Sequence, residues 1–166
     1  MIPPAFDGTT ILTVRRTFPA ARERVFRAWT EREALLQWFR PRGMGVTISK
    51  LDVQVGGSFC FDVADGSISL VGTYLEIVRP EKLVFTWSSA ATSDKETVVT
   101  VEFIEYGLMT QVVLTHGQLS SKEMRSLHQA GWQALLDQLD IVFSPLVSGT
   151  EPVSDEHFAQ TRRSCP

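Results

Sequence analysis

Cysteine and histidine are scarce in this chain of 166 residues. The two cysteines, Cys60 and Cys165, do not have the spacing of a zinc site or of a redox motif. The three histidines, His116, His128 and His157, share no ligand spacing, so the sequence predicts no metal site. A phosphate-binding loop, a dinucleotide fingerprint and a nucleophile elbow are also missing, and we expect no cofactor.

Positive charge and long apolar runs are also limited. The chain has 16 Lys and Arg against 19 Asp and Glu, and no basic cluster could follow a phosphate backbone, so we expect no nucleic-acid partner. No apolar run reaches the ~20 residues that a membrane-spanning helix needs. The first residues lack the basic and apolar regions of a signal peptide, and we therefore expect a cytoplasmic protein.

Apolar residues are abundant enough for a core. They make up 43% of the chain, which at this length favours one domain. We expect this domain over residues 9–145. Residues 146–166 are mostly polar and include Gly149 and Pro152, and they predict a flexible C-terminal extension.

The first part of the chain predicts a strand and two short helices. Alternating apolar residues favour a strand over residues 9–18. Pro19 is typical of a helix start, and a helix is expected from there to Trp29. Thr30 and Glu33 have the spacing of a capping box, which predicts the start of a second short helix.

The middle of the chain predicts antiparallel strands whose register is set by turns. A turn at Asp65-Gly66 would pair Val63 with Ile68 and Phe59 with Gly72. The same counting places Tyr74, Val78, Phe85 and Trp87 on one apolar face, together with Glu76 unless a bulge intervenes.

A second turn, at Tyr106-Gly107, predicts another hairpin. It would pair Thr97 with His116 and Val101 with Val112. In both hairpins one face is apolar and the other polar, as in antiparallel sheets that cover a core on one side.

The last element is a long amphipathic helix. Ser120 and Glu123 form the expected capping box, and the helix should run to about Phe143. Its apolar face contains Met124, Leu127, Trp132, Leu135, Leu136, Leu139, Val142 and Phe143. The order of elements predicts an α+β fold in which a curved antiparallel sheet wraps around this helix, with a cavity between them.

Several short motifs resemble a known family when they are taken in order. They are Val25-Phe26-Arg-Ala-Trp29, Trp38-Phe39-Arg-Pro41, Gly72-Thr-Tyr74, Pro80-Glu-Lys-Leu83-Val-Phe-Thr-Trp87 and Gly131-Trp132. From about residue 10 to residue 144 the chain resembles the activator-of-heat-shock-protein-90-ATPase-like family. That family belongs to the START-related helix-grip (SRPBCC) superfamily.

The resemblance implies a helix-grip fold with a hydrophobic cavity between the sheet and the C-terminal helix. Superfamily members include lipid and hormone carriers, polyketide cyclases and co-chaperone domains. No set of catalytic residues can be transferred from the family to this sequence.

We expect the cavity to be lined by residues of the sheet, the second short helix and the long helix. The candidate ligand-binding residues are Arg16, Trp38, Phe59, Phe61, Tyr74, Phe85, Trp87, Val101, Leu114, His116, Gly131, Trp132 and Leu135. The alternative for each aromatic residue is an ordinary place in the core.

Two glycines favour the cavity. Gly72 should lie opposite Phe59, and Gly131 should face the sheet from mid-helix, where glycine costs roughly 1 kcal/mol relative to alanine. A missing side chain at these places admits either close packing by a neighbouring ring or a ligand.

Two polar candidates have alternative roles. His116 could bond Thr97 or the backbone at the rim, or it could orient a ligand or act as a general acid or base. Arg16 could pair with a carboxylate such as Glu76, or it could hold an acidic ligand.

Three functions follow from these expectations. The first is a protein that binds a hydrophobic or amphipathic small molecule, such as a lipid. The second is a cyclase- or hydrolase-type enzyme that uses His116, Tyr74 or Arg16 in the same cavity. The third is a protein that interacts with a chaperone. The exposed sheet edges are compatible with a monomer or a homodimer.

Overall fold

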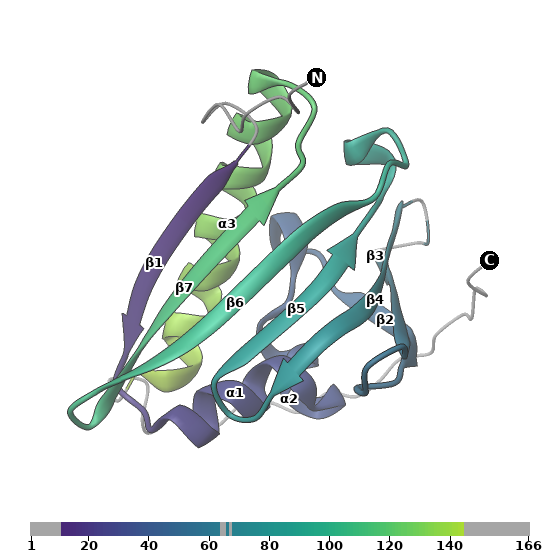
Figure 1. Cartoon of the computed structure of the whole chain (residues 1–166). Coiled ribbons are helices and arrows are strands. Elements are labelled where there is room, and N and C mark those ends of the chain that lie inside the picture. The colour runs from purple at the N-terminus through teal and green to yellow at the C-terminus, as the bar shows by residue number, and fades with distance from the viewer. Residues whose placement is uncertain (1–10, 64–65, 67, 145–166) are drawn as a thin grey trace.

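A long helix lies across the concave face of a curved antiparallel sheet in the computed structural model, which describes residues 11–63, 66 and 68–144 (Figure 1). The elements follow the chain as β1 (Leu12–Phe18), α1 (Arg22–Thr30), α2 (Arg32–Trp38), η1 (Pro41–Gly43), β2 (Val46–Leu51), β3 (Ser58–Val63), β4 (Ile68–Val78), β5 (Lys82–Trp87), η2 (Ala90–Thr92), β6 (Thr97–Tyr106), β7 (Met109–Gly117) and α3 (Lys122–Phe143). The ends of the predicted domain, at residues 9, 10 and 145, and the predicted extension, residues 146–166, lie outside the described residues.

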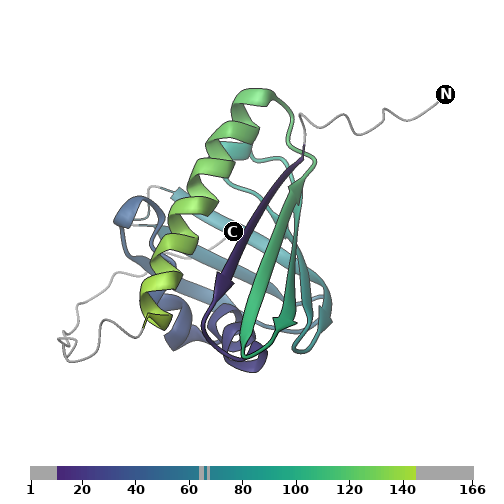
Figure 2. The same cartoon turned by 90° about the vertical axis from the view of Figure 1, so that its left-hand side faces the viewer.

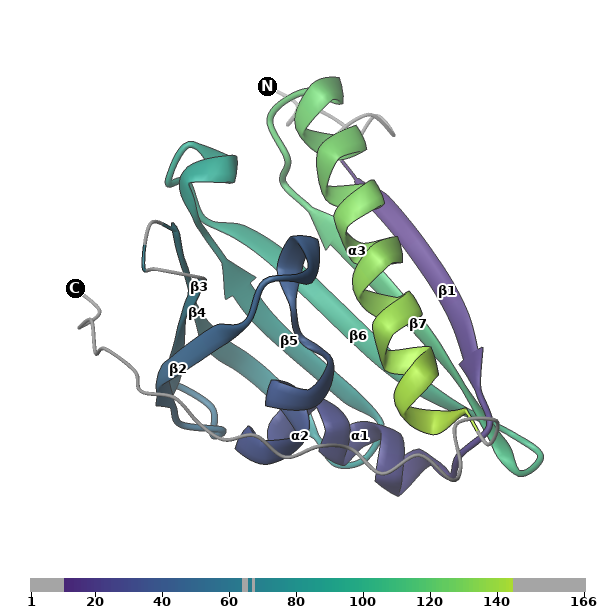
Figure 3. The same ribbon diagram turned by 180° about the vertical axis from the view of Figure 1, so that it is seen from behind.

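The sheet has seven strands in the order β1-β7-β6-β5-β4-β3-β2, all antiparallel to their neighbours. Helix α3 packs beside β1 at one side of the sheet (Figure 2). The view from behind shows α1 and α2 on the same face as α3, near one end of the strands (Figure 3). This arrangement confirms the predicted α+β helix-grip fold. No helix in the described part of the chain is both long and apolar enough to cross a membrane.

The register of β3 and β4 is the one that the sequence predicts. Val63 pairs with Ile68, and Phe59 pairs with Gly72. Gly66 has a φ of +87°, which glycine adopts without strain. Asp65, the other residue of the predicted turn, lies outside the described residues.

The register of β6 and β7 differs from the prediction by two residues. Val99 pairs with His116, and Tyr106 pairs with Met109. The two turn residues are therefore Gly107 and Leu108, with Gly107 in the left-handed region at a φ of +66°. Side chains alternate between the two faces of a sheet, so a shift of two residues leaves each side chain on the same face. The predicted faces of β6 and β7 are therefore correct although the predicted register is wrong.

A bulge in β4 explains why the predicted face of its last residues is wrong. Tyr74 pairs with Phe85 but Glu76 pairs with Val84, so Leu75 is the extra residue. The bulge turns Glu76 to solvent, where its carboxylate lies 3.3 Å from Lys82 Nζ. Val78 is exposed for the same reason.

Helix α3 begins one residue later than predicted. The hydroxyl oxygen of Ser121, not that of Ser120, accepts the backbone N–H of Met124 at 3.1 Å. The buried stripe of α3 is also narrower than predicted, since Leu127 is 51% exposed and Val142 is exposed as well. The residues that α3 buries are His128, Trp132, Leu135, Leu136, Leu139 and Phe143.

The two short helices also start differently from the prediction. Helix α1 begins at Arg22, three residues after Pro19. Helix α2 has Glu31 at its N-cap and no side-chain cap. Thr30 does not form the expected capping box, because its hydroxyl donates to the carbonyl oxygen of Phe26 at 3.3 Å. This back-bond within α1 competes with capping, as it often does for threonine.

Candidate functional site

The space between the sheet and the helices contains a cavity of about 20 Å³ walled by aromatic rings. Its lining residues are Trp29, Leu35, Trp38, Phe39, Phe59, Phe61, Tyr74, Phe85, Trp87 and Trp132. Every one of them except Leu35 is aromatic, and they include all four tryptophans of the chain. No charged side chain is among them, so the wall is apolar apart from the polar atoms of its indole and phenol groups.

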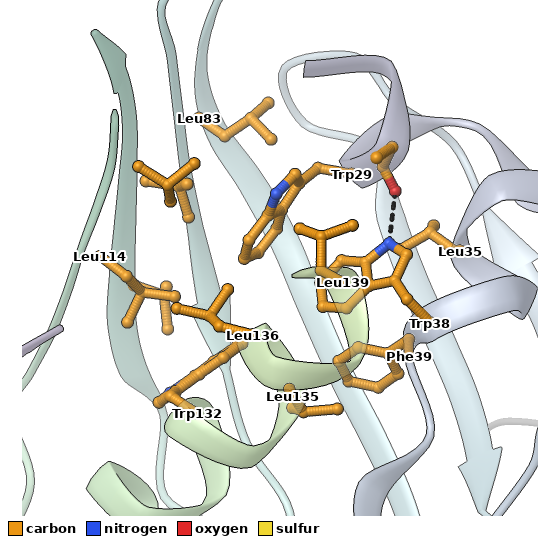
Figure 4. Close-up of a cluster of buried hydrophobic side chains, with 14 of the residues drawn as sticks. Trp29, Leu35, Trp38, Phe39, Leu83, Leu114, Trp132, Leu135, Leu136 and Leu139 are labelled. Carbon is orange, nitrogen blue, oxygen red and sulfur yellow. Dashed lines mark hydrogen bonds between the residues drawn. The ribbon is translucent and has the colours of Figure 1, made fainter. Parts of the chain in front are cut away.

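Each helix contributes tryptophan rings that meet in the centre of the molecule. Trp29 of α1 stacks on Trp132 of α3 with ring centroids 6.2 Å apart, and Trp38 of α2 lies 4.9 Å from Trp29. Trp87 of β5 contacts Trp132 from the sheet, at 5.0 Å. Figure 4 shows Trp29 and Trp38 close together beside Leu139, with Trp132 on the other side of Leu136.

The cavity is small in this conformation. A volume of about 20 Å³ holds roughly one water molecule, whereas benzene occupies an engineered cavity of about 150 Å³. Gly72 does not add space, because a Cβ at this position would overlap the carbonyl oxygen of Thr86 and the ring of Phe59. Of the two possibilities for Gly72, the structure has the close packing of a neighbouring ring.

Gly131 does not face the sheet, contrary to the prediction. It is exposed, and a Cβ placed on it would have no atom within 4 Å. The neighbouring Trp132 takes the inward position, and one residue along a helix turns the side chain by about 100°. Replacing Gly131 would therefore not fill a cavity between the helix and the sheet.

The structure brings together seven of the predicted site residues in the cavity wall: Trp38, Phe59, Phe61, Tyr74, Phe85, Trp87 and Trp132. Val101, Leu114 and Leu135 are buried in the surrounding core but are not part of the lining. The prediction missed Trp29, Leu35 and Phe39, which also line the cavity. Their position beside Trp38 in two consecutive short helices is the signal that could have identified them.

His116 is fully buried at the centre of a chain of hydrogen bonds. An indole N–H can only donate, so Trp132 Nε1 donates to His116 Nδ1 at 3.0 Å. The proton of neutral His116 is therefore on Nε2, which donates to Thr97 Oγ1 at 2.8 Å. The Thr97 hydroxyl in turn donates to the carbonyl oxygen of Trp87 at 2.7 Å.

Burial, and to a lesser extent the charge of nearby His128, lowers the pKa of His116 to about 3. The two imidazole rings are 5.1 Å apart, and His128 Nδ1 donates to the carbonyl oxygen of Met124 at 2.9 Å. His116 is thus a neutral group with both nitrogens bonded. It is not at the rim, and it fixes the orientation of Trp132 in the cavity wall.

Arg16 belongs to a different contact from the one expected. It lies in β1 beside α3, where its guanidinium pairs with Asp137 at 2.8 Å and donates to the carbonyl oxygen of Gln133 at 3.5 Å. Glu76 is not its partner. Arg16 does not line the cavity, so the pairing with a carboxylate accounts for its position on the helix side of β1.

The polar groups of the cavity wall fall into two sets. Trp38 Nε1 donates to the carbonyl oxygen of Ala28 at 2.8 Å, the dashed line in Figure 4, and Trp132 Nε1 donates to His116. Trp29 Nε1 is buried and has no hydrogen-bond partner. Within the described ranges, Trp87 Nε1 and the Tyr74 hydroxyl also make no hydrogen bond, but neither of these atoms is fully buried.

The environment of Tyr74 keeps its hydroxyl protonated. Burial raises the pKa of this phenol well above its ordinary value of 10.0. Tyr74 can therefore donate a hydrogen bond at any physiological pH.

Among the residues that the structure describes, no group of three or more His, Cys, Asp or Glu is arranged to hold a metal ion.

Comparison with known proteins places this architecture among solved structures. The sequence matches the family model "Activator of Hsp90 ATPase homolog 1-like protein" over residues 19–144. An HSP90 activator from Plasmodium falciparum is 27% identical, with a TM-score of 0.64 over 80% of this chain and 95% of that one. An AHSA1 protein from Silicibacter pomeroyi is 26% identical, with a TM-score of 0.68 over 80% and 96%.

A protein from Chromobacterium violaceum has the same fold at 22% identity. Its TM-score is 0.71, and the match covers 82% of this chain and 98% of that one. No curated protein matches the chain. The similarity to solved structures therefore extends over most of the chain and over nearly the whole of these three proteins.

Proposed function

Because the chain belongs to the activator of Hsp90 ATPase homolog 1-like family, we propose that its aromatic cavity binds a small apolar molecule between the sheet and the helices. The observation that carries this proposal is the lining itself. It gathers four tryptophans and five other aromatic rings around one space and includes no charged side chain. Ligand pockets are typically lined by such side chains, with a few polar groups that orient the ligand.

Binding requires the wall to open, because the cavity now holds only about one water molecule. The wall that we expect to open is α2 together with the turn that follows it. Helix α2 has seven residues and no side-chain cap, and helices this short are marginal without packing. Among the described residues, one hydrogen bond ties this region to α3, from Gln138 Nε2 to the carbonyl oxygen of Arg40 at 3.1 Å. We expect α2 to move away from α3 when a ligand enters.

Native mass spectrometry of the freshly purified protein tests this proposal, followed by organic extraction of any bound molecule. We expect a defined small molecule at near one-to-one stoichiometry. A Leu35→Trp variant, which fills the cavity from α2, should lose it. Leu36→Trp is the matched control, since Leu36 is 39% exposed and Leu35 only 3%. Equal retention by two folded variants would place the ligand elsewhere.

Activation of a chaperone ATPase is a second candidate function. It is favoured by the family description and by the Plasmodium falciparum protein, an HSP90 activator 27% identical to this chain. The test adds the purified protein to an Hsp90-type chaperone and measures ATP hydrolysis. An increase that saturates with added protein supports this function, and an unchanged rate at a saturating concentration contradicts it.

An enzyme that uses the same cavity has less support. His116 lacks a free nitrogen, and its lowered pKa makes proton uptake unfavourable near neutral pH. Arg16 is outside the lining. Tyr74 is the one member of the expected acid–base set that lines the cavity, and a phenol with a raised pKa is a weak acid.

A further inference from the structure

We propose that a disulfide joins Cys60 to Cys165 of the same chain and fastens the C-terminal segment, residues 145–166, over the outer face of the sheet. The outer face is the side of β2, β3 and β4 that points away from the aromatic cavity. Cys60 is disulfide-bonded, and the chain has one other cysteine, Cys165, which lies outside the described residues. This inference concerns a different site from the aromatic cavity and does not depend on the proposed function.

Cys60 is buried on the face of the sheet that lies away from the helices. Side chains alternate along a strand, and Phe59 and Phe61 line the cavity, so Cys60 points to the outer face. Helices α1, α2 and α3 lie on the opposite face (Figure 3). Cys60 is nevertheless only 1% exposed, although it is not part of the hydrophobic core cluster. A further layer of chain over the outer face accounts for this burial.

Asp62, the next outer-face residue of β3, is buried as well, at 3% exposure. Its carboxylate accepts hydrogen bonds from the hydroxyls of Ser69 at 2.6 Å and Ser49 at 3.0 Å. One of its oxygens lies 3.9 Å from Cys60 Sγ. The sulfur therefore belongs to a polar cluster that is removed from solvent on the side where an antiparallel sheet of this kind normally meets water.

The C-terminal segment carries a charge that complements this cluster. Within the ranges that the structure describes, no Lys or Arg pairs with the Asp62 carboxylate. Burial of a carboxylate is costly, and a positive charge nearby reduces the cost. Arg162 and Arg163 are close to Cys165 in the sequence, so a disulfide at Cys165 brings two positive charges to the outer face.

A hollow of about 190 Å³ beside Cys60 gives the segment a place to bind. Its lining offers both hydrogen-bond donors and acceptors, which a polypeptide needs for its C=O and N–H groups. The polar side chains of this lining are those of Lys50, Ser58, Thr73, Thr86, Ser88 and Glu96. The hollow therefore suits a short stretch of main chain.

The segment is long enough to reach Cys60. Helix α3 ends at Phe143, and residues 144–164 separate this end from Cys165. An extended chain of this length spans roughly 70 Å. A domain of this size has a radius of gyration of about 14 Å. The segment can therefore pass around an edge of the sheet and arrive on the outer face.

Formation of the disulfide requires an oxidant, for which a small disulfide such as oxidised glutathione is sufficient. The two cysteine thiols lose two protons and two electrons as the Sγ–Sγ bond forms. Glutathione disulfide accepts them, its own S–S bond breaks, and it leaves as two thiols. Because the cytosol keeps most thiols reduced, the segment is released there and fastened under oxidising conditions.

Peptide mapping without a reductant tests the link. The full chain is equilibrated with oxidised and reduced glutathione, unfolded with iodoacetamide present to block free thiols, and digested with trypsin. We expect residues 51–82, which contain Cys60, to be recovered covalently joined to residues 164–166, which contain Cys165. Reduction should separate the two peptides and make the intact protein heavier by two hydrogen atoms.

Cys165→Ser is the matched control. Its substitution lies outside the sheet and the helices, and it leaves Cys60 without a partner in the chain. The same treatment should then give residues 51–82 unlinked, with Cys60 alkylated or bound to glutathione. Recovery in this form shows that the Cys60 thiol can be detected when it is not in the disulfide.

A redox titration tests whether the segment is held on the outer face. The ratio of oxidised to reduced glutathione at which half of the protein is oxidised gives the effective concentration of the two thiols toward each other. We expect this effective concentration to be about tenfold or more higher in the folded protein than in concentrated urea, because binding of the segment brings Cys165 to Cys60.

Three results would overturn the inference. Recovery of both peptides alkylated or bound to glutathione means that no disulfide forms. A joined pair that occurs only in a covalent dimer means that the disulfide links two copies of the chain. Equal effective concentrations in the folded and unfolded protein mean that the segment is linked but not held on the outer face. Each of these results leaves the ligand test of the aromatic cavity unaffected.

Discussion

At the scale of single residues, His116 illustrates how burial turns a reactive side chain into a structural one. Both ring nitrogens have partners, and they alternate as acceptor and donor: Nδ1 accepts from Trp132, and Nε2 donates to Thr97. A second proton on Nδ1 would point at the indole N–H of Trp132. Protonation therefore means loss of a buried hydrogen bond as well as burial of a charge.

This arrangement predicts a dependence of stability on pH. The pKa of His116 is about 3 in the folded protein and near its ordinary 6.5 in the unfolded chain, so the unfolded chain binds more protons between these values. The contribution to the free energy of unfolding is complete above the unfolded pKa. It falls by up to ~1.4 kcal/mol per pH unit as pH decreases toward the folded value.

Urea unfolding at about pH 7 and about pH 5 measures this loss, with His116→Gln as a variant that does not titrate. The unmodified protein should lose more stability between the two pH values than the variant does. An equal loss in both proteins would mean that His116 accepts a proton in the folded state, against the geometry described above.

Replacing Gly131 with alanine and replacing Gly72 with alanine are expected to change the stability of the protein in opposite directions. Gly131→Ala should raise the free energy of unfolding by roughly 1 kcal/mol, because the new methyl group meets open space and alanine favours helix. Gly72→Ala should lower it by roughly 1–3 kcal/mol, because the methyl group meets the Thr86 carbonyl and the Phe59 ring. Thermal and urea unfolding measure both. A destabilising Gly131→Ala would indicate that α3 packs against another surface at this point.

Sequence periodicity was sufficient to choose the strand residues of the cavity wall but not its polar partners. Alternation along β3, β4 and β5 places Phe59, Tyr74 and Trp87 on one face whatever the details of the loops. The partner of Arg16 could not be found in this way. The identity of this partner, Asp137, depends on the position of α3 along β1, which is determined by the packing of the whole helix.

At the scale of elements, helix ends, turns and a bulge are where the structure differs from the sequence predictions. A two-residue hairpin at Tyr106-Gly107 and one at Gly107-Leu108 have the same glycine and the same alternating strands. The choice depends on which position of the turn takes the positive φ of Gly107, and the sequence does not determine it. The β4 bulge is similar, since nothing in the residues around Leu75 signals an extra residue.

The start of α3 gives a direct test at this scale. Ser121→Ala removes the oxygen that accepts the Met124 N–H and should destabilise the protein by about 1 kcal/mol. Ser120→Ala is the matched control, because Ser120 contacts the Met124 sulfur rather than a helix N–H and should cost much less. Urea unfolding of the two variants compares them. The reverse order of stabilities would restore Ser120 as the N-cap.

At the scale of the whole molecule, the first strand of the sheet along the chain, β1, forms one edge of the sheet and pairs with the last strand, β7. Leu12 pairs with His116 and Phe18 with Thr110, so most of the described chain before α3 lies between the partners. Strands β6 and β7, in contrast, are joined by a two-residue turn. Contacts between distant residues carry a larger entropy cost for loop closure, so they tend to form late in folding.

Kinetic measurements on two valine variants test this order. Val14→Ala in β1 should destabilise the protein by roughly 2 kcal/mol, mainly through faster unfolding, because its contacts form after the transition state. Val101→Ala in β6 is the comparison, and it should slow folding to a greater extent. Stopped-flow folding and unfolding rates give both values. If Val14→Ala slows folding as much as Val101→Ala does, β1 is already docked in the transition state.

The gathering of all four tryptophans also has an optical consequence. Their rings are linked by centroid distances of 4.9, 6.2 and 5.0 Å, short enough for excitation energy to pass from one indole to the next. Light absorbed by any of them is therefore emitted from a shared set of neighbouring chromophores. The intrinsic fluorescence of this protein reports on one place, the cavity, and a change in its colour or intensity signals a change there.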